Sequence, residues 1–453
     1  MTQQGVRWTA DQVLALAPDP ASRTAGSRLG AAGAWSGAGS SGEGTVWGLC
    51  EGGGSTPYRT VVDVADASGP AYQCSCPSRK FPCKHALGLL LLWSGGDGVV
   101  PRGEAPKWAE HWIAGRRTRA EQKRTAGRSD SSGSSDSAGP KAARRRAERR
   151  AERVTAGAVE LEQRLADLLR GGLASAEQSG YGLWEETAAR MVDAQAPGLA
   201  ARVRELGALA GTGPGGPVRL LEECALLHLL GQGWLRRERL PEGLAATVRS
   251  RIGLPASADG PAIRDRWLVL AQYDTADSRL TTRRVWLYGA GSGRTALLLS
   301  YGAAGRAPEL ALPVGLALDA ELSAYPGAEQ PRVALGERFA PPAPTDVRPP
   351  GTTTARAAAR YGEALRDDPW LDSVPVTLDR VVPAPDGDGW QLADADEDAA
   401  LPLTPAARSR PGLWRLVALS GGAPVRVFGE CGHQGFTPLA AWPEGPGEVV
   451  PLC

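Results

Sequence analysis

The chain has 453 residues, enough for about three domains. Its formal net charge is +1, so no overall electrostatic field attracts nucleic acid or a membrane surface. Hydrophobic residues make up 42% of the chain and charged residues 22%, which is ordinary for a soluble globular protein.

The sequence predicts a cytoplasmic protein without membrane contact. Residues 1–8 lack the cationic and apolar segments of a secretory signal. The longest strongly apolar run, Ala86–Trp93, is far shorter than the roughly 20 residues of a membrane helix. Because cytosolic thiols stay reduced, the seven cysteines indicate metal binding or catalysis rather than disulfides.

The first hundred residues predict two short helices, three strands and a buried helix. The helices are Thr9–Leu16 and a second one that opens at Asp19-Pro20, and Gly-rich sequence follows as far as Gly44. Turn residues then separate strand-like stretches of β-branched and aromatic residues. The predicted strands are Thr45–Cys50, Tyr58–Val64 and Ala71–Ser75, and the predicted helix is His85–Trp93.

The composition changes after about residue 115. Residues 116–153 hold 13 Lys or Arg against five Asp or Glu, a net charge of +8. Within them, Ser129–Pro140 has the composition of a linker that cannot bury a core. A long amphipathic helix is predicted over Lys141–Arg170, and helical sequence with Gly/Pro breaks over Leu183–Gly253. Its segment Val218–Leu230 is apolar on nearly all sides, so we expect it to be buried.

After Pro261 the pattern becomes that of strands, interrupted by one predicted helix at Thr354–Arg366. The predicted strands are Trp267–Tyr273, Arg284–Tyr288, Thr295–Tyr301, Val376–Val382, Trp390–Leu392, Trp414–Leu419 and Val425–Phe428. The expected fold is α+β and multidomain. Its parts are a ββα-type zinc module with N-terminal helices at 1–113, a basic Ser/Gly-rich linker at 114–142, a helical domain at 143–256 and a β-rich domain at 257–453.

The residues that carry chemistry form a C-x-C-x6-C-x-H pattern. They are Cys74, Cys76, Cys83 and His85. Three thiolates and one imidazole are a standard tetrahedral ligand set for a structural zinc ion. A disulfide and a Cys–His nucleophile pair are the alternatives. The first conflicts with the expected compartment, and the second leaves two neighbouring cysteines unexplained.

This motif, followed by Leu89–Leu92, resembles a SWIM-type zinc finger. The resemblance implies a ββα module with one zinc ion held by these four residues. Segment 48–58 is similar to the lead-in of bacterial members. Asp265-Arg266-Trp267 and residues 283–287 resemble the body of long bacterial SWIM proteins.

The resemblance also implies function and partners. SWIM modules are associated with DNA binding and with protein–protein contact. The long bacterial forms resemble proteins encoded beside MoxR-type AAA ATPases and von Willebrand A-domain proteins. We therefore expect a zinc-binding interaction protein whose finger contacts a protein partner, with the remainder as scaffold. The alternative is a nucleic-acid-binding protein that uses the finger and the basic linker.

The finger itself carries a candidate contact surface. Lys80 and Lys84 cannot bind zinc at neutral pH and should face solvent, and Phe81 lies between them. Phe81 either joins this surface or packs under the zinc loop. The basic stretch Arg116–Arg153 could contact phosphates through Arg144–Arg146, Arg149 and Arg150, with Lys80 and Lys84 adding to them. A solvated helix partly neutralised by Glu148 and Glu152 is the preferred interpretation.

The remaining cysteines and histidines have structural interpretations. Cys50 is expected to be a buried thiol. Cys224 and His228 have metal-compatible spacing, but their Leu-rich surroundings favour core packing with a hydrogen-bonded histidine. Cys431-Gly432-His433 lacks a second C-x-C and is interpreted as a turn. His111 is expected to pack between Trp108 and Trp112.

Two glycine-rich segments resemble ligand loops only in part. Gly289–Thr295 lacks the spacing and lysine of a phosphate-binding loop, so a hairpin turn is predicted. Residues 386–389 begin like a calcium loop, but Trp390 takes the next ligand position. The acidic cluster of Asp394, Asp396, Glu397 and Asp398 is interpreted as a solvated loop. Without a catalytic motif, and with a closed zinc set, we do not expect an enzyme.

Overall fold

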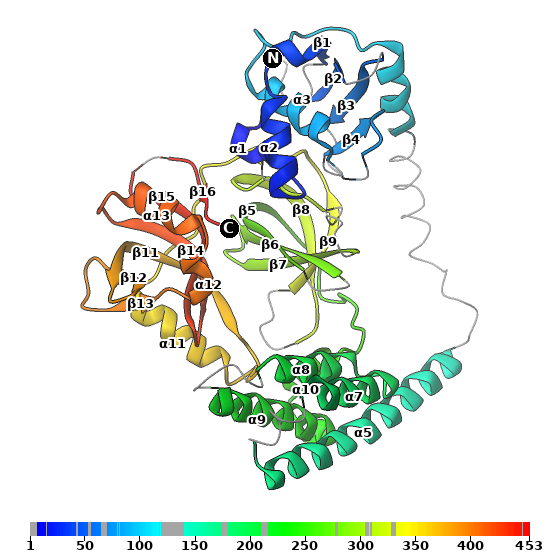
Figure 1. The fold of residues 1–453 in the computed structure, drawn as a ribbon, viewed down its shortest axis with the longest axis vertical. Helices are drawn as coiled ribbons and strands as arrows, with labels where there is room; N and C mark the ends of the chain where they lie inside the picture. Colours follow the sequence, from blue (N-terminus) through cyan, green and yellow to red (C-terminus); the bar gives the residue numbers. More distant parts are fainter. Residues whose placement is uncertain are drawn as a thin grey trace.

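The computed structural model consists of a zinc module, a helical bundle, a β-barrel and a C-terminal β unit (Figure 1). The predicted linker Ser129–Pro140 lies outside the described residues up to position 139, and so does Phe81. The structure describes the chain except for residues 1–6, 15, 42–43, 53–55, 65–69, 79, 81, 117, 119–139, 174–179, 210–215, 277–279, 304–307, 309, 328–331 and 446.

The zinc module is a four-stranded antiparallel sheet, in the order β1-β2-β3-β4, with helix α3 against one face. α3 is hydrophobic nearly all round, and eight of its residues are buried, six of them in the hydrophobic core of the module. The module comprises α1 (Ala10–Leu14), α2 (Pro20–Arg28), β1 (Trp35–Ser40), β2 (Thr45–Cys50), β3 (Tyr58–Asp63), β4 (Ala71–Cys74) and α3 (Lys84–Ser94).

Strand β1 was not expected from its Gly-rich sequence. Gly37 has a positive φ of 58°, and the register shifts between Ser36 and Gly39, so the strand is bulged. The indole of Trp47 lies directly against Gly39, where an added Cβ would stand 2.8 Å from the indole nitrogen. The glycines therefore make room for a buried tryptophan. Because they have no side chain, the alternation of apolar and polar residues that would indicate a strand is missing.

The helical bundle has one core of buried apolar side chains from all five helices. The predicted burial of Val218–Leu230 is only half right, because Val218 and Leu221 are 62% and 46% exposed. Leu220, Cys224 and Leu227 face the core instead, at helical spacing. The helices are α5 (Pro140–Gly171), α7 (Gly180–Asp193), α8 (Pro197–Leu209), α9 (Gly216–Leu235) and α10 (Glu242–Ile252).

The barrel follows the sheet order β10-β8-β5-β6-β7-β9, and pairing of β8 with β9 closes it. Its interior is filled by apolar residues around Trp267. β8 and β9 were not predicted. The strands are β5 (Ile263–Ala276), β6 (Leu280–Gly289), β7 (Thr295–Ala303), β8 (Leu316–Ala324), β9 (Arg332–Arg338) and β10 (Ala343–Pro344).

The C-terminal unit is a six-stranded antiparallel sheet, in the order β13-β12-β11-β14-β15-β16, packed with helices. The elements are α11 (Thr354–Ala364), β11 (Ser373–Asp386), β12 (Gly389–Asp394), β13 (Ala400–Pro402), α12 (Pro405–Arg408), α13 (Gly412–Ser420), β14 (Val425–Gly432), β15 (Gly435–Pro443) and β16 (Val450–Pro451).

One predicted strand of this unit is wrong, because Trp414–Leu419 lies in helix α13. Leu413 and Leu416 are buried three positions apart, whereas Trp414 is 63% exposed, which is the period of a helix. Gly421, with a φ of 53°, ends the helix in the left-handed conformation. The segment is so short and so apolar that its sequence pattern does not distinguish the two-residue period of a strand from the 3.6-residue period of a helix.

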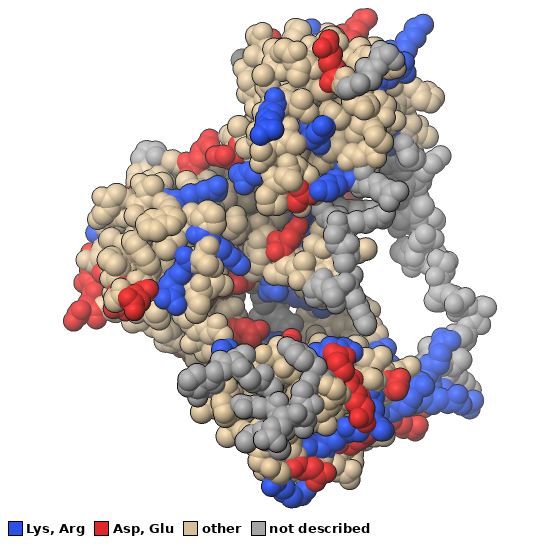
Figure 2. Space-filling view, viewed as in Figure 1, with Lys and Arg blue, Asp and Glu red and all other residues tan. Residues whose placement is uncertain are grey.

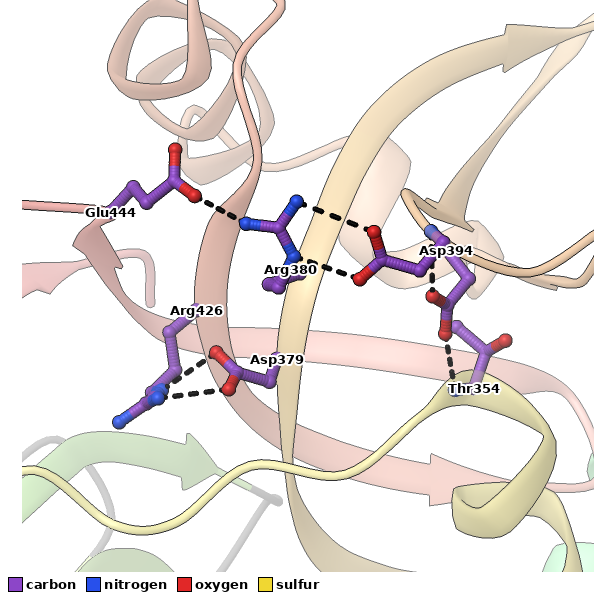
Figure 3. Close-up of polar contacts among 7 residues, drawn as sticks. Thr354, Asp379, Arg380, Asp394, Arg426 and Glu444 are labelled. Carbon is purple, nitrogen blue, oxygen red and sulfur yellow. Dashed lines mark hydrogen bonds and ion pairs between the residues drawn. The ribbon is translucent and has the colours of Figure 1, made fainter.

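The acidic cluster is more than a solvated loop. Arg380, at a bulge of β11 with a φ of 50°, forms ion pairs with Asp396 and with Glu444 (Figure 3). Asp394 accepts a hydrogen bond of 3.2 Å from the backbone N–H of Thr354, at the start of α11. These contacts join the β12–β13 loop to β11, α11 and the segment after β15.

The units are packed against one another. Leu316 of the barrel belongs to the core cluster of the zinc module, and Gln12 donates to the backbone oxygen of Val314. Trp370 enters the core of the bundle, and Arg251 pairs with the buried Asp368 at 2.6 Å. Among the described helices, none has the length and apolar character needed to cross a membrane.

Candidate metal centre

The four predicted ligands come together where β4 ends and α3 begins. Cys74 is the last residue of β4, and Cys76 follows on the chain between strand and helix. Cys83 is the N-cap of α3, with extended backbone, and His85 lies in the first turn. Placing Cys83 at the cap directs its sulfur toward the end of the strand, where the positive end of the helix favours thiolate.

The geometry suits a single tetrahedral ion. The three Sγ atoms and one imidazole nitrogen all lie within 4.8 Å of one another, and Cys74 Sγ is 3.6 Å from His85 Nδ1. Two sulfur donors about 2.3 Å from a tetrahedral zinc would be about 3.8 Å apart. The donor set and its spacing therefore fit one structural zinc ion, with all four positions filled by protein.

Proton sharing among the sulfurs is strong. A hydrogen bond from Cys83, with further ones from His85 and Thr60, lowers the pKa of Cys74 to about 3 although burial opposes this. The same contact with Cys74, together with burial, raises the pKa of Cys83. Burial also raises the pKa of Cys76. Three thiols thus compete for one negative charge, and a bound zinc ion would supply the positive charge that stabilises all three thiolates.

Two residues of β3 support the ligands and were not anticipated. Thr60 Oγ1 lies 3.3 Å from Cys74 Sγ, and the Tyr58 ring lies 4.8 Å from the His85 ring, tilted by 35°. The signal that could have found them is the alternation of a strand, since positions 58 and 60 share one face of β3. Outer contacts of this kind orient the ligands of a metal ion.

Comparison with known proteins agrees with this geometry. A family model of the SWIM zinc finger matches residues 58–93, which run from β3 through α3. The chain is a SWIM zinc finger protein. A second model, the SWIM-associated four-helix bundle domain, matches residues 149–252, from within α5 to the end of α10. No curated protein and no solved structure matches the chain.

The fifth cysteine of the module lies outside the SWIM ligand cluster. Cys50 is fully buried at the end of β2, and its Sγ lies 3.7 Å from the backbone oxygen of Glu51. Burial raises the pKa of this thiol. It is therefore a buried thiol, as predicted, and not one of the SWIM ligands.

The other candidate ligands do not form metal sites in the described part of the chain. Cys224 is buried, but His228 is 57% exposed, and its Nδ1 lies 2.6 Å from Glu162 Oε2. The expected hydrogen bond is present. The expected burial of His228 is wrong, because its side chain faces away from the bundle core that contains Cys224. His111 is likewise exposed, while its neighbours Trp108 and Trp112 pack on the module.

The glycine-rich segments are turns, as predicted. The β6–β7 turn, Gly289–Thr295, directs the N–H groups of Gly291 and Ser292 onto the Asp265 carboxylate, at 2.9 and 2.7 Å. An acidic residue thus occupies the place that a phosphate would take. Residues 386–389 form the β11–β12 hairpin, and Cys431 and Gly432 end β14 just before its turn into β15.

Two candidate contact residues of the SWIM finger, Lys80 and Lys84, border a cavity of about 640 Å³. Lys80 Nζ pairs with Asp19 Oδ2 at 2.7 Å, so one of the two cations is partly neutralised. Lys84 is exposed at the start of α3. The cavity is bounded by Ala25 of α2, by Leu29 directly after this helix, by Tyr58, and by the zinc ligands Cys76 and His85.

Proposed function

We propose that this SWIM protein is a non-enzymatic interaction protein that docks a protein partner beside its zinc ion. The observation that carries the proposal is the 640 Å³ cavity whose wall includes two of the four metal ligands. Since Cys76 and His85 are held in place by the metal, the shape of the cavity depends on zinc. Metal loading and partner binding would then be linked.

The chemistry of the cavity favours a particular contact. Its inner surface offers apolar side chains, Ala25, Leu29 and Tyr58, to an apolar side chain of the partner. Lys84, at the rim, can form an ion pair with a carboxylate of the partner. Lys80 can do the same if the partner's carboxylate replaces Asp19. A partner segment with an apolar residue beside an acidic one would fit this arrangement.

A protein partner is better supported than a nucleic acid. Only a few phosphates could be neutralised by the finger, because Lys80 is engaged by Asp19 and the nearby Glu51 is acidic. On α5, residues 144–153 hold six arginines and two glutamates, and the glutamates neutralise part of this charge, as in the Arg144–Glu148 pair at 3.0 Å. Acidic and basic side chains mix along this helix in Figure 2.

The non-enzymatic part of the proposal rests on the metal site and on the histidines. Four protein donors leave no position on the ion for water or substrate. Of the three histidines outside the zinc site, His228 is paired with Glu162, His111 is exposed beside two packed tryptophans, and His433 lies in the turn between β14 and β15. Neither His228 nor His111 faces a nucleophile among its described contacts.

The test measures partner binding by the full, zinc-loaded chain. A MoxR-type AAA ATPase and a von Willebrand A-domain protein from the same genome are purified and titrated against it. Exchanging both lysines for glutamate, K80E/K84E, should weaken binding at least tenfold at low salt, and less at high salt. The matched control K107E reverses an exposed lysine that does not line the cavity and should bind like wild type.

Zinc content by elemental analysis and the circular dichroism spectrum should be the same for all three proteins. Equal binding by K80E/K84E and wild type would contradict docking at this cavity. Steeply salt-dependent binding of random duplex DNA, lost in K80E/K84E, would favour the nucleic-acid alternative.

A further inference from the structure

A second and larger cavity lies at the meeting point of the bundle, the barrel and the C-terminal unit. Its volume is about 1320 Å³, beyond the roughly 300–1000 Å³ of pockets for small molecules. Figure 2 shows the molecule hollowed between the bundle and the β-rich units, with basic side chains visible inside the hollow. The size suits an extended ligand rather than a compact one.

The barrel wall of this cleft presents three arginines: Arg284 on β6, Arg294 in the β6–β7 turn and Arg332 on β9. Within the described residues, none of the three guanidinium groups forms an ion pair with a carboxylate. Arg332 is stacked over the ring of Tyr325 at 4.4 Å, and the Nε of Arg284 is buried without a hydrogen-bond partner. Glu430, which accepts hydrogen bonds from Trp286 and Tyr273, also lines the cavity, so this side holds three arginines against one carboxylate and keeps an excess of positive charge.

The strand register fixes the spacing of two of these arginines. Trp286 pairs with Leu297, which pairs with Arg332, and Arg284 lies two residues before Trp286 on the same face. Two strand spacings across and two residues along give a Cα separation of about 12 Å. In an extended peptide this distance corresponds to residues about four positions apart.

The opposite wall has a different character. It carries charges of both signs, with Arg202 near Glu223 at 4.0 Å. The acidic residues are Glu205, Glu223, Asp367 and Asp372, and the basic ones are Arg202, Arg219, Arg251 and Arg360. Burial raises the pKa of Glu205, Arg202 opposes this, and Asp372 and Glu223 add to the increase. A nucleic acid carries negative charge along its whole length and would meet these carboxylates, whereas a peptide can place its acidic residues on the barrel arginines and uncharged residues opposite, so a peptide fits better.

The aromatic residues of the floor are not stacking platforms. Trp286 and Tyr288 are only 3% and 9% exposed. The Trp286 ring packs edge-on against Phe428, and its Nε1 donates to Glu430 at 3.0 Å. Because their faces are covered, these rings cannot bind nucleobases, although Leu297 and Leu299 add apolar surface to the same floor.

From this arrangement we infer that the cleft binds an extended acidic peptide segment of a partner protein. Two of its carboxylates, about four residues apart, bind Arg284 and Arg332. A third group can reach Arg294, and apolar side chains between the carboxylates lie on Leu297 and Leu299. Carboxylate–guanidinium hydrogen bonds supply the affinity and set the direction of the peptide. The site is separate from the zinc-side cavity and does not depend on the proposed function.

The experiment pans the full, zinc-loaded chain against phage-displayed random dodecapeptides, and measures enriched peptides by fluorescence anisotropy. We expect enrichment of peptides with paired Asp or Glu three to five positions apart. The double variant R284Q/R332Q should lose about tenfold in affinity for each arginine removed. The matched control R266Q removes an exposed barrel arginine outside the cleft and should bind like wild type.

A second double variant, R294Q/R332Q, keeps the test valid if loss of the partly buried Arg284 disturbs the barrel. K80E/K84E should bind the same peptides normally, which separates this site from the zinc-side cavity. Enrichment of basic or uncharged peptides, no enrichment, or unchanged binding by a folded cleft variant would overturn the inference. So would tighter binding of a dT20 oligonucleotide than of any acidic peptide.

Discussion

The zinc module and the barrel are neighbouring β units that stabilise their chain reversals in different ways. The sheet of the zinc module is open, and its β4 edge leads into a connection to α3 in which no described residue is in a strand. The barrel closes on itself through β8 and β9. In a closed barrel, the backbone groups of the outermost strands hydrogen-bond to each other, whereas the last strand of an open sheet needs another constraint.

The same contrast holds for single loops. The β6–β7 turn is fixed by the Asp265 carboxylate, which accepts hydrogen bonds from the N–H groups of Gly291 and Ser292. In the connection between β4 and α3, the described contacts include Ser75, which exchanges two hydrogen bonds with Arg59, and Lys80, which bonds the Ser78 hydroxyl and pairs with Asp19. The zinc ligands lie at both ends of this connection, so a bound ion would tie the end of β4 to the start of α3. Metal should dominate the stability of the zinc module and have a much smaller effect on the barrel, which the module contacts at Leu316 and Val314.

The largest expected effect is the loss of zinc. Cys76→Ser or Cys83→Ser should remove about one zinc per chain and unfold the module from about residue 45 to residue 93. Binding of a structural zinc is worth about 10–16 kcal/mol, and in so small a unit most of this is folding free energy. Elemental analysis measures the metal, and hydrogen exchange compares peptides of the module with those of the barrel, which should stay protected.

Cys50→Ser is the matched control for these variants. It changes a buried thiol of the same module that is not a ligand, so zinc should be retained. Burying a hydroxyl in place of the thiol should cost only about 1–3 kcal/mol of unfolding free energy. Full metal content in both ligand variants, or metal loss in Cys50→Ser, would contradict the assignment of the ligands.

A smaller effect, mainly on the barrel, is expected from Arg283→Ala. The Arg283 side chain is 4% exposed, bonds both oxygens of Asp274 at 2.7 and 2.8 Å and donates to the carbonyl of Leu310. Removing one partner of a buried pair costs about 3 kcal/mol because the other is left unpaired. Urea unfolding should show this loss with zinc content unchanged. Zinc loss at native conditions would mean that the two units are not independent.

The sequence predicted the metal site more completely than the fold, for a physical reason. A closed ligand set demands particular residue types at fixed spacing, so Cys74, Cys76, Cys83 and His85 could be read directly. The long helix over Lys141–Arg170 was equally clear, because a strong period extends over eight turns of α5.

The elements and contacts that the sequence did not predict depend on tertiary packing. β1 contains glycines that make room for Trp47, and α13 is too short for its period to outweigh its apolar composition. Asp265 and Arg283 were noticed only for their resemblance to the body of long SWIM proteins. Their roles become visible once the barrel brings Asp265 to Gly291, and Arg283 to Asp274. Such contacts join strands whose register the sequence leaves open.

The smallest expected effect is an acid-dependent one, and it concerns the β6–β7 turn. Burial opposes ionisation of Asp265, but hydrogen bonds from Ser292, Gly291 and Arg266 outweigh it and lower the pKa of this carboxyl. The folded state therefore takes up its proton less readily than the unfolded state. The stabilisation is present in full above the ordinary pKa of aspartate and is lost as the pH falls through the folded-state value.

Asp265→Asn should remove this contribution and leave the turn with a neutral acceptor. At pH 7 the barrel should lose less than about 1 kcal/mol, since the site is partly exposed and screened by solvent. The difference between wild type and variant should shrink as the pH is lowered from 7 to 3. Acid also releases zinc by protonating thiolates, but this affects both proteins equally and cancels in the difference. If the difference in unfolding free energy grew toward low pH, the carboxylate would be destabilising. The β6–β7 turn would then not be held by Asp265 in the way that a metal ion holds the connection between β4 and α3.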